Sequence, residues 1–202
     1  MTATALAPVS WQRMEQGIEQ VRRRLERAAK ALATAGVRYA VVGGNAVAAW
    51  VSRVEPAAVR NTRDVDILLR RADLDAAKSA MEAAGFVHRL VASFGKGGVM
   101  DVFLDGPEAN VRDAVHILWA GERAVPGALE PTPELGSTET AGNFELIPLA
   151  DLLWMKLTSF RDKDRMHLRD LAGVGLVDES WLARFPAALA KRLRAILDDP
   201  EG

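Results

Sequence analysis

The chain has 202 residues, with 26 lysines and arginines against 27 aspartates and glutamates, and it contains no cysteine. The lack of cysteine excludes disulfides, iron–sulfur clusters and cysteine-based zinc sites. The net charge of -1 argues against a protein that coats nucleic acid by electrostatics alone. Its 49% hydrophobic and 26% charged residues are typical of a soluble chain of one domain, or one domain with a small appendage.

No segment has the pattern of a targeting signal or a membrane anchor. Residues Met1 to Ser10 lack the basic start and apolar core of a signal peptide. The apolar runs are far shorter than the roughly 20 residues that span a bilayer. We therefore expect a cytoplasmic protein that does not enter the membrane.

The first predicted element is a helix over Trp11 to Ala35, ended by Gly36. Arginines at 22, 23, 24 and 27 lie mostly off its apolar stripe and are interpreted as a solvated face. The stripe steps by threes and fours, which places its members on one face: Trp11, Met14, Ile18, Val21, Leu25, Ala28 and Leu32. We expect residues 1–36 to form an N-terminal helix packed on the core.

Mixed strands and helices are predicted next, over residues 37–147. Gly43 and Gly44 are expected to break the first strand before a short helix begins at Asn45. The strong strand signals come from β-branched and aromatic residues and the helix signals from alanine-rich periodic segments. In chain order the segments are a strand at Val37–Val42, a helix at Asn45–Ser52, a loop at Arg53–Arg63, a strand at Asp64–Leu69, a helix at Leu74–Ala84 capped by Asp73, and strands at Phe86–Ala92, Val99–Leu104, Ala114–Trp119 and Phe144–Ile147.

Turn residues at Asp105–Gly106–Pro107 predict that the strands Val99–Leu104 and Ala114–Trp119 form a hairpin. A long loop is expected over Gly121 to Gly142. From Pro148 onward the pattern is helical, with breaks near Gly173–Gly175 and Pro186. The sequence thus predicts an α/β or α+β fold with a core at 37–147 and a helical C-terminal subdomain at 148–202.

Asp64 and Asp66 are the most informative pair in the chain. Side chains alternate across a strand, so the two carboxylates share one face while Val65, Ile67 and Leu69 share the other. Two like charges this close need a cation, a shared proton or a basic neighbour. Because both ligands are oxygens, Mg²⁺ or Mn²⁺ is the ion that suits them.

A strand, glycine turn and helix precede this pair by about twenty residues. Gly43 and Gly44 allow close backbone approach, and the free N–H groups of a helix start favour phosphate oxygens. Arg60 and Arg63 stand directly before the aspartates and are good bidentate phosphate partners. This is not the Gly-x-Gly-x-x-Gly pattern, which argues against a dinucleotide-binding fold.

In combination these motifs resemble the DNA polymerase β-type nucleotidyltransferases, and more narrowly their minimal bacterial branch with abortive-infection and toxin–antitoxin members. The residues that carry the resemblance are Gly43 and Gly44, then Arg60 and Thr62, then Asp64 and Asp66. The resemblance implies a mixed sheet flanked by helices. It also implies transfer of a nucleoside monophosphate from a nucleoside triphosphate, with two divalent ions and release of pyrophosphate. Asn45 then stands where the family commonly has serine, in the turn that contacts the phosphates.

The family also has a third carboxylate on a neighbouring strand, and two residues compete for this place. Asp101 has the hydrophobic–acid–hydrophobic surroundings of such a ligand. His116 is the alternative, because relatives often carry aspartate at the matching point before a similar Gly–Glu. A histidine ligand would favour Mn²⁺ or another transition ion. Both assignments are kept here, with Asp101 preferred.

Lys156 lies in the middle of an apolar helical stripe, where an unpaired ammonium is costly. It either reaches out to solvent along its stem or points into a cleft lined with acid or phosphate. The resemblance favours the cleft, because relatives have a lysine near the nucleotide phosphates. It also draws attention to Asp164 and Asp170, and His167 is a weaker acid–base candidate.

The sequence therefore predicts a metal-dependent nucleotidyltransferase. Asp64, Asp66 and either Asp101 or His116 would hold the metals, Gly43, Gly44 and Asn45 would cradle the β- and γ-phosphates, and Arg60, Arg63 and Lys156 would neutralise phosphate charge. The acceptor would be a tRNA end, a protein hydroxyl or a small molecule. The alternative is a nucleotide-binding or toxin–antitoxin partner with little or no activity on the same fold. An antitoxin or a second copy of the chain is the expected protein partner.

Overall fold

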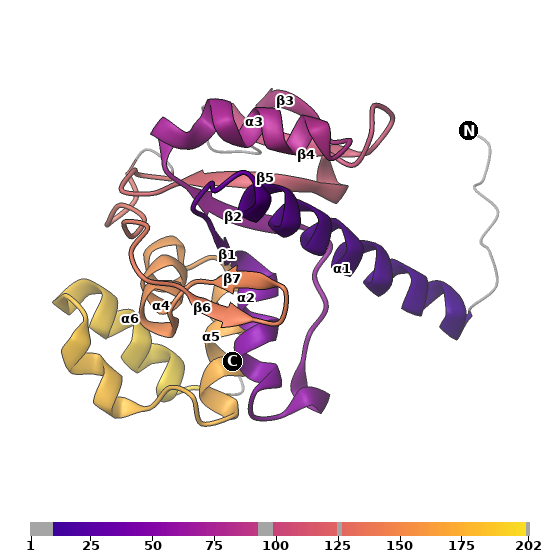
Figure 1. The fold of residues 1–202 in the computed structure, drawn as a ribbon. Helices are drawn as coiled ribbons and strands as arrows, with labels where there is room; N and C mark the ends of the chain where they lie inside the picture. Colours follow the sequence, from indigo (N-terminus) through magenta and orange to yellow (C-terminus); the bar gives the residue numbers. More distant parts are fainter. Residues whose placement is uncertain (1–9, 93–98, 125–126, 201–202) are drawn as a thin grey trace, which may run out of the picture.

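The computed structural model describes residues 10–92, 99–124 and 127–200, and these form a mixed sheet between two layers of helices (Figure 1). Residues 1–9, which belong to the predicted N-terminal segment, lie outside the described part, as do 125–126 within the predicted loop. The described strands are β1 (Ala40–Val42), β2 (Val65–Leu69), β3 (Val87–Ala92), β4 (Val99–Leu104), β5 (Ala114–Trp119), β6 (Glu139–Ala141) and β7 (Phe144–Leu146).

Six α-helices and four short 3-10 helices complete the described part. The α-helices are α1 (Trp11–Thr34), α2 (Gly43–Ser52), α3 (Leu74–Ala83), α4 (Leu149–Ser159), α5 (Asp162–Gly173) and α6 (Ala187–Leu197). The 3-10 helices are η1 (Pro56–Ala58), η2 (Arg71–Asp73), η3 (Val111–Asp113) and η4 (Glu179–Arg184). No helix among the described residues is long and apolar enough to cross a bilayer.

The strand order is β3-β4-β5-β2-β1-β7-β6 within the described residues. The pairs β2–β5 and β1–β7 are parallel, and the other pairs are antiparallel, including the predicted β4–β5 hairpin. The mixed sheet flanked by helices that the sequence predicts is confirmed, and so is the hairpin.

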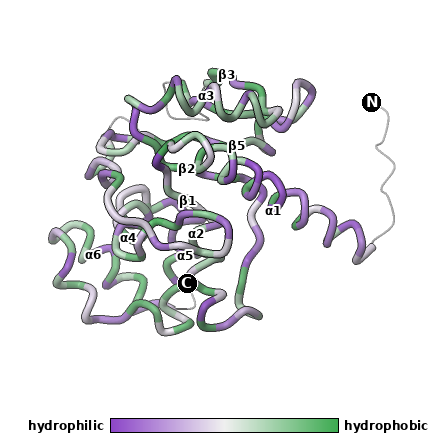
Figure 2. Tube along the Cα trace, in the orientation of Figure 1, coloured by the Kyte–Doolittle hydropathy of each residue, from purple (hydrophilic) through white to green (hydrophobic). Residues whose placement is uncertain are grey.

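Each face of the sheet has its own hydrophobic core. On one face Ile67 and Phe103 pack against Leu25 and Leu32 of α1 and Met81 of α3. On the other face the core extends from the sheet through α2 into α4, α5 and α6, and it includes Leu68, Val47, Trp50, Leu153, Leu168 and Leu193. Figure 2 shows hydrophobic residues gathered in the central strands, while α1 is largely hydrophilic. Alternation along β2 therefore sends Val65, Ile67 and Leu69 to the first face, and Asp66 and Leu68 to the second.

The entry to α2 differs from the sequence prediction. Gly43 and Gly44 do not break the chain before a helix at Asn45; they are the first two residues of the helix itself. Gly43 has φ +67, a left-handed conformation that glycine adopts without strain, and this lets the chain pass from β1 into α2 with no loop between them. β1 is also shorter than predicted, because pairing with β2 begins at Ala40.

Candidate functional site

Asp66 lies at the centre of the sheet, on the face covered by α2, α4 and α5. It is opposite Val42 of β1 and His116 of β5, so the three side chains share this face. His116 Nδ1 is 3.5 Å from Asp66 Oδ1, and its Nε2 is 3.0 Å from the carbonyl oxygen of Val111. The carbonyl can only accept a hydrogen bond, so Nε2 carries the proton and Nδ1 faces the aspartate.

The glycine turn packs directly against this carboxylate. A Cβ atom at Gly43 would overlap Asp66 Oδ2, and one at Gly44 would come within 2.9 Å of the Thr62 side chain. The absence of both side chains thus lets the start of α2 approach the acidic pair. The backbone N–H groups at this helix start are the donors that an anion can use.

Asp64 stands at the entrance to β2, next to the same turn. The Asn45 side-chain amide donates a 2.7 Å hydrogen bond to the backbone carbonyl of Asp64. The Asp64 carboxylate is about one-third exposed and lies 3.8 Å from the Lys163 ammonium. Asn45 therefore links the backbone at Asp64 to α2. Because its side-chain amide is used in this hydrogen bond, it is not free to contact phosphate as the serine does in the proteins that the sequence resembles.

Lys156 is buried, with 5% of its surface exposed, so its ammonium does not reach bulk solvent along its stem. Its Nζ is 3.2 Å from Asp164 Oδ1, and Asp66 is a second negative charge nearby. Burial lowers the pKa of Lys156, and the two carboxylates offset only part of that effect. Of the two sequence-based outcomes, the acid-lined environment is the one observed.

Asp164 is completely buried and anchors the junction between α4 and α5. It accepts hydrogen bonds from Ser159 Oγ (2.7 Å), from the Arg161 side chain (2.7 Å) and from the Arg161 backbone N–H (3.2 Å). Burial alone raises the pKa of Asp164, but the Arg161 hydrogen bond and the Lys156 charge hold it well below its ordinary range. Asp164 is thus a charged residue that orients Lys156.

Lys163 is a cation of the site that sequence reasoning missed. Its Nζ lies 3.4 Å from Thr62 Oγ1 as well as near Asp64. It was one of many charges in the run from Arg161 to Arg169, and no local pattern distinguished it. Only the return of α5 to residues 60–64 places it beside the acidic pair.

The prediction that Asp101 joins Asp64 and Asp66 is corrected by the strand register. Val102 pairs with His116, so Asp101, one residue earlier, faces the opposite side of the sheet. There it is buried and forms a 2.7 Å contact with His88 Nε2. His116 instead occupies the place beside Asp66.

Arg60 and Arg63 are held by other carboxylates. Arg60 Nε is 2.8 Å from Asp170 Oδ1, and Arg63 Nη2 is 2.9 Å from Asp113 Oδ1. Both guanidinium groups are more than half exposed, whereas the Asp170 side chain is 12% exposed and the Asp113 side chain 34%. The two arginines that the sequence assigned to phosphate are thus each paired with a carboxylate in the structure.

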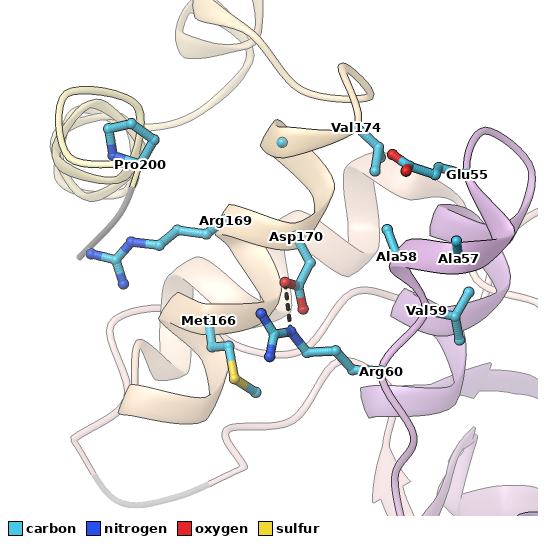
Figure 3. Close-up of a pocket in the computed structure, with 11 residues that line it drawn as sticks. Glu55, Ala57, Ala58, Val59, Arg60, Met166, Arg169, Asp170, Val174 and Pro200 are labelled. Atoms are coloured by element: carbon cyan, nitrogen blue, oxygen red, sulfur yellow. Dashed lines mark hydrogen bonds and ion pairs between the residues drawn. The ribbon is translucent and has the colours of Figure 1, made fainter.

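A pocket of about 650 Å³ lies between η1 and α5 (Figure 3). The Arg60–Asp170 ion pair stands in it, with Met166 and Arg169 from α5. Neither Asp64 nor Asp66 is among its lining residues. The acidic pair therefore does not line this pocket.

His167 is a buried histidine of α5 that faces the cations of the site. It is 4% exposed, and its Nδ1 has no hydrogen-bond partner within the described part of the chain. Burial and the positive charges of Lys156 and Lys163 lower its pKa to about 4. His167 is therefore neutral at pH 7.

Asp66 and His116 stabilise each other's charged forms. Burial alone raises the pKa of Asp66, but the His116 hydrogen bond and the charges of His116, Lys156 and Lys163 bring it below its ordinary value. Burial alone lowers the pKa of His116, and its bonds to Asp66 and to the Val111 carbonyl raise it overall. Asp66 is therefore an ionised carboxylate inside the protein.

The donors fit a divalent ion in kind. Asp64 and Asp66 supply carboxylate oxygens, and His116 Nδ1 can add a nitrogen only after it loses the proton that it donates to Asp66; a backbone carbonyl orients its ring. Among the described residues, no group of three or more His, Asp or Glu side chains is placed so that together they could hold a metal ion. Mg²⁺ in nucleotide enzymes is commonly held by one or two carboxylates plus substrate phosphates, so a complete cage is not required.

Three comparisons relate this geometry to known proteins. A family model described as an uncharacterised nucleotidyltransferase matches residues 9–113. No curated protein matches the chain. The solution structure of the antibiotic-resistance factor ANT(2'')-Ia is similar with a TM-score of 0.50 and 14% identity, over 91% of this chain and 93% of that one.

Two further solved structures are similar at lower scores. JHP933 from Helicobacter pylori has 17% identity and a TM-score of 0.47, over 96% of this chain and 78% of its own. An antigenic nucleotidyltransferase-like protein from Paracoccidioides brasiliensis has 15% identity and a TM-score of 0.45, over 90% and 87%. At these identities the similarity to ANT(2'')-Ia shows the fold alone.

Proposed function

Because the chain belongs to the family of uncharacterised nucleotidyltransferases, whose model covers more than half of it, we propose that it transfers a nucleoside monophosphate from a nucleoside triphosphate to a hydroxyl acceptor. An acceptor oxygen attacks the α-phosphorus, the bond to the β-phosphate oxygen breaks, and pyrophosphate leaves. The acceptor's proton is lost to solvent or to a nearby base. The acceptor class is an RNA end, a protein hydroxyl or a small molecule.

The observation that carries this proposal is the packing of Asp66 against Gly43. It brings an ionised carboxylate, a helix start with free N–H donors and the Lys156 ammonium to one point on the sheet. A triphosphate needs both kinds of partner: donors and cations for its oxygens, and an acidic position for the cation that accompanies it. Few other residues are needed, because phosphoryl-type transfer depends mainly on positioning and electrostatics.

The triphosphate would lie between the start of α2 and the start of α5. The N–H groups of Gly44 and Asn45 would bind its terminal phosphates, with Lys163 and Lys156 balancing negative charge from the α5 and α4 sides. Lys163 is about half exposed and can follow the ligand. Lys156 is fixed by Asp164 and acts from a set position.

Asp64 and Asp66 would hold Mg²⁺ or Mn²⁺, with His116 Nδ1 as a third donor. When bound, such an ion neutralises phosphate charge and lowers the pKa of the attacking hydroxyl. A nitrogen donor suits Mn²⁺ better than Mg²⁺. We therefore expect binding of the nucleotide to be stronger with Mn²⁺.

A second candidate is nucleotide binding without turnover. The replacement of the third carboxylate by His116 favours it, because one negative charge is missing from the set that the family uses. In this case the chain would bind a nucleoside triphosphate and metal and release no pyrophosphate.

The test is a pyrophosphate-release assay with the four nucleoside triphosphates, Mg²⁺ or Mn²⁺, and pools of RNA, protein and small polyol acceptors. Wild type should release pyrophosphate with at least one combination. Asp66→Asn should reduce this rate by about a hundredfold or more, since it removes a carboxylate that would hold the metal ion against the phosphates.

Asp101→Asn is the matched control, because it is also a strand aspartate but lies on the other face. It should leave the rate within about twofold, provided that the variant stays folded by circular dichroism. Equal rates for wild type and Asp66→Asn would contradict the proposal. Tight nucleotide binding with no release under any condition would support the second candidate instead.

A further inference from the structure

Arg24 is a buried arginine in the middle of α1. Its side chain is 6% exposed, whereas those of Arg22 and Arg23 are 59% and 75% exposed. The interpretation of this arginine run as a solvated face is therefore wrong for Arg24. A buried guanidinium is costly unless its N–H groups are paired, so the partners of Arg24 indicate what it does.

Arg24 bonds to two segments that are far from it in the sequence. Its Nη1 donates a hydrogen bond to the backbone carbonyl of Arg63 at 3.2 Å, and its Nε donates to Asp105 Oδ2 at 3.3 Å. Arg63 directly precedes the acidic pair, and Asp105 directly follows β4. Figure 1 shows α1 alongside β2 and β5, which it contacts. Arg24 therefore ties α1 to the entrance of β2 and to the end of β4.

The backbone at Asp64 lies just outside the strand pairing. Asp64 stands one residue before β2, whose pairing with β5 begins at Val65 and whose pairing with β1 begins at Asp66. The sheet therefore does not by itself fix the φ and ψ angles of Asp64. These two angles set the direction of the Cα–Cβ bond, and so the direction in which the carboxylate leaves the chain.

Two side chains hold the two peptide groups that flank Asp64. The peptide group before Asp64 carries the Arg63 carbonyl, which Arg24 holds. The peptide group after Asp64 carries its own carbonyl, which Asn45 holds at 2.7 Å. Because each peptide group is planar, fixing both planes fixes φ and ψ of the residue between them. Arg24 from α1 and Asn45 from α2 thus act on the two sides of one residue.

We propose that Arg24 is a positioning residue of the candidate site, which directs the Asp64 carboxylate by holding the Arg63 carbonyl. This role rests on the proposed function, in which Asp64 holds the metal ion that accompanies the nucleotide. Groups that orient metal ligands without touching the metal typically contribute about ten- to a hundredfold in metal affinity or activity. The helix α1 then contributes to the site through the backbone of the acidic segment.

The first measurement follows this backbone and needs no nucleotide. Amide hydrogen exchange of the full chain, read by mass spectrometry, compares wild type, Arg24→Met and Arg23→Met. Arg24→Met should raise the exchange rate of residues 62–66 about tenfold and leave residues 163–170 of α5 unchanged. Arg23→Met is the matched control, because Arg23 is exposed and pairs with Glu19 of its own helix. It should change neither segment.

The second measurement is calorimetric titration of a nucleoside triphosphate in the presence of Mn²⁺. Arg24→Met should lower the metal-dependent affinity about tenfold. Asp105→Asn is the control for a purely structural role, because it removes the charge beside Arg24 and keeps the bond to Arg63. Asp105→Asn should lower stability in urea but leave the affinity within about twofold.

Two results would overturn the proposal. An unchanged exchange rate at residues 62–66 in Arg24→Met would mean that Arg24 does not hold this backbone, whether or not the chain binds a nucleotide. Equal losses of affinity in Arg24→Met and Asp105→Asn would mean that Arg24 acts only on the stability of the fold.

The two measurements also separate this proposal from the proposed function. If wild type binds no nucleotide with metal, the proposed function fails, and the exchange rate at residues 62–66 alone decides whether Arg24 positions Asp64. If Arg24→Met does not fold, Arg24→Lys replaces it, because lysine keeps the charge beside Asp105 but loses the planar fork that reaches both acceptors. The same two changes are expected at a smaller size, and the absence of both would contradict the role of Arg24.

Discussion

At the scale of single residues, the candidate site depends on the contact between Gly43 and Asp66. The left-handed φ of Gly43 and its lack of a Cβ are both needed where the carboxylate packs. The sequence predicts that Asp64 and Asp66 share one face of a strand, and in the structure Asp66 lies in β2 while Asp64 stands one residue before it. The sequence could not decide between Asp101 and His116, because one residue of register moves a side chain to the other face of the sheet.

Gly43→Ala should therefore damage the site and the fold together. The methyl group would displace Asp66, and φ +67 is strained for alanine, so we expect a loss of about 2–4 kcal/mol in unfolding free energy. Gly173→Ala is the control, because a Cβ there meets nothing within 4 Å. It should change stability by less than about 1 kcal/mol. Urea unfolding measures both, and equal effects would contradict the proposed close approach.

Lys156→Met tests the buried ammonium. Asp164 would lose one partner but keep Arg161 and Ser159, so we expect a loss of about 1–3 kcal/mol in stability. Nucleoside triphosphate binding should weaken by about 1.5–3 kcal/mol, the range for a bond to a charged group. Lys191→Met, at an exposed position of α6, should change neither.

Thermal melts and a nucleotide titration on these two variants separate the roles. If Lys156→Met loses stability while binding is unchanged, Lys156 is a structural ion-pair residue. The role proposed for it at the phosphates would then be wrong.

At the scale of elements, α5 connects the C-terminal helices to the acidic pair. Three polar residues recur along one face of this helix: Lys163, His167 and Asp170. Lys163 lies near Asp64, His167 is close to the positive charges of Lys156 and Lys163, and Asp170 forms an ion pair with Arg60. The helix itself was predictable from its boundaries near Asp162 and Gly173. The partners of its charged residues were not, because a run with both signs offers many equivalent pairings and only the tertiary fold selects among them.

The buried His167 predicts how stability changes with pH. The pKa of His167 in the folded state is about 4, below the roughly 6.5 of histidine in an unfolded chain. As the pH falls from 6.5 to 4, His167 is therefore protonated in the unfolded state while it stays neutral in the folded state. His167 should thus cost up to roughly 2–3 kcal/mol of stability across this window and nothing above it.

His167→Gln should flatten this part of the stability profile. Chemical unfolding of wild type and variant at several values between pH 4 and 8 measures the difference. The two curves should run parallel above pH 7 and converge or cross below 6. Parallel curves over the whole range would contradict a neutral, buried imidazole.

At the scale of the whole molecule, the sheet register brings distant segments to one site. β2 lies between β1 and β5, so residues near 43, 66 and 116 meet although the sequence separates them widely. The sequence predicted most of the strands and helices because their periods are clear. It did not predict that α2 starts at Gly43, since paired glycines usually interrupt a helix, and here the contact with Asp66 and Thr62 outweighs that tendency.

The most direct test of the proposed nucleotide and metal site is calorimetric titration of a nucleoside triphosphate into the full chain with Mn²⁺ or Mg²⁺. Wild type should bind only when metal is present. The double variant Asp64→Asn, Asp66→Asn should stay folded by circular dichroism and lose the metal-dependent part of the affinity. An unchanged affinity in this double variant, in the presence of either metal, would contradict the assignment of the site.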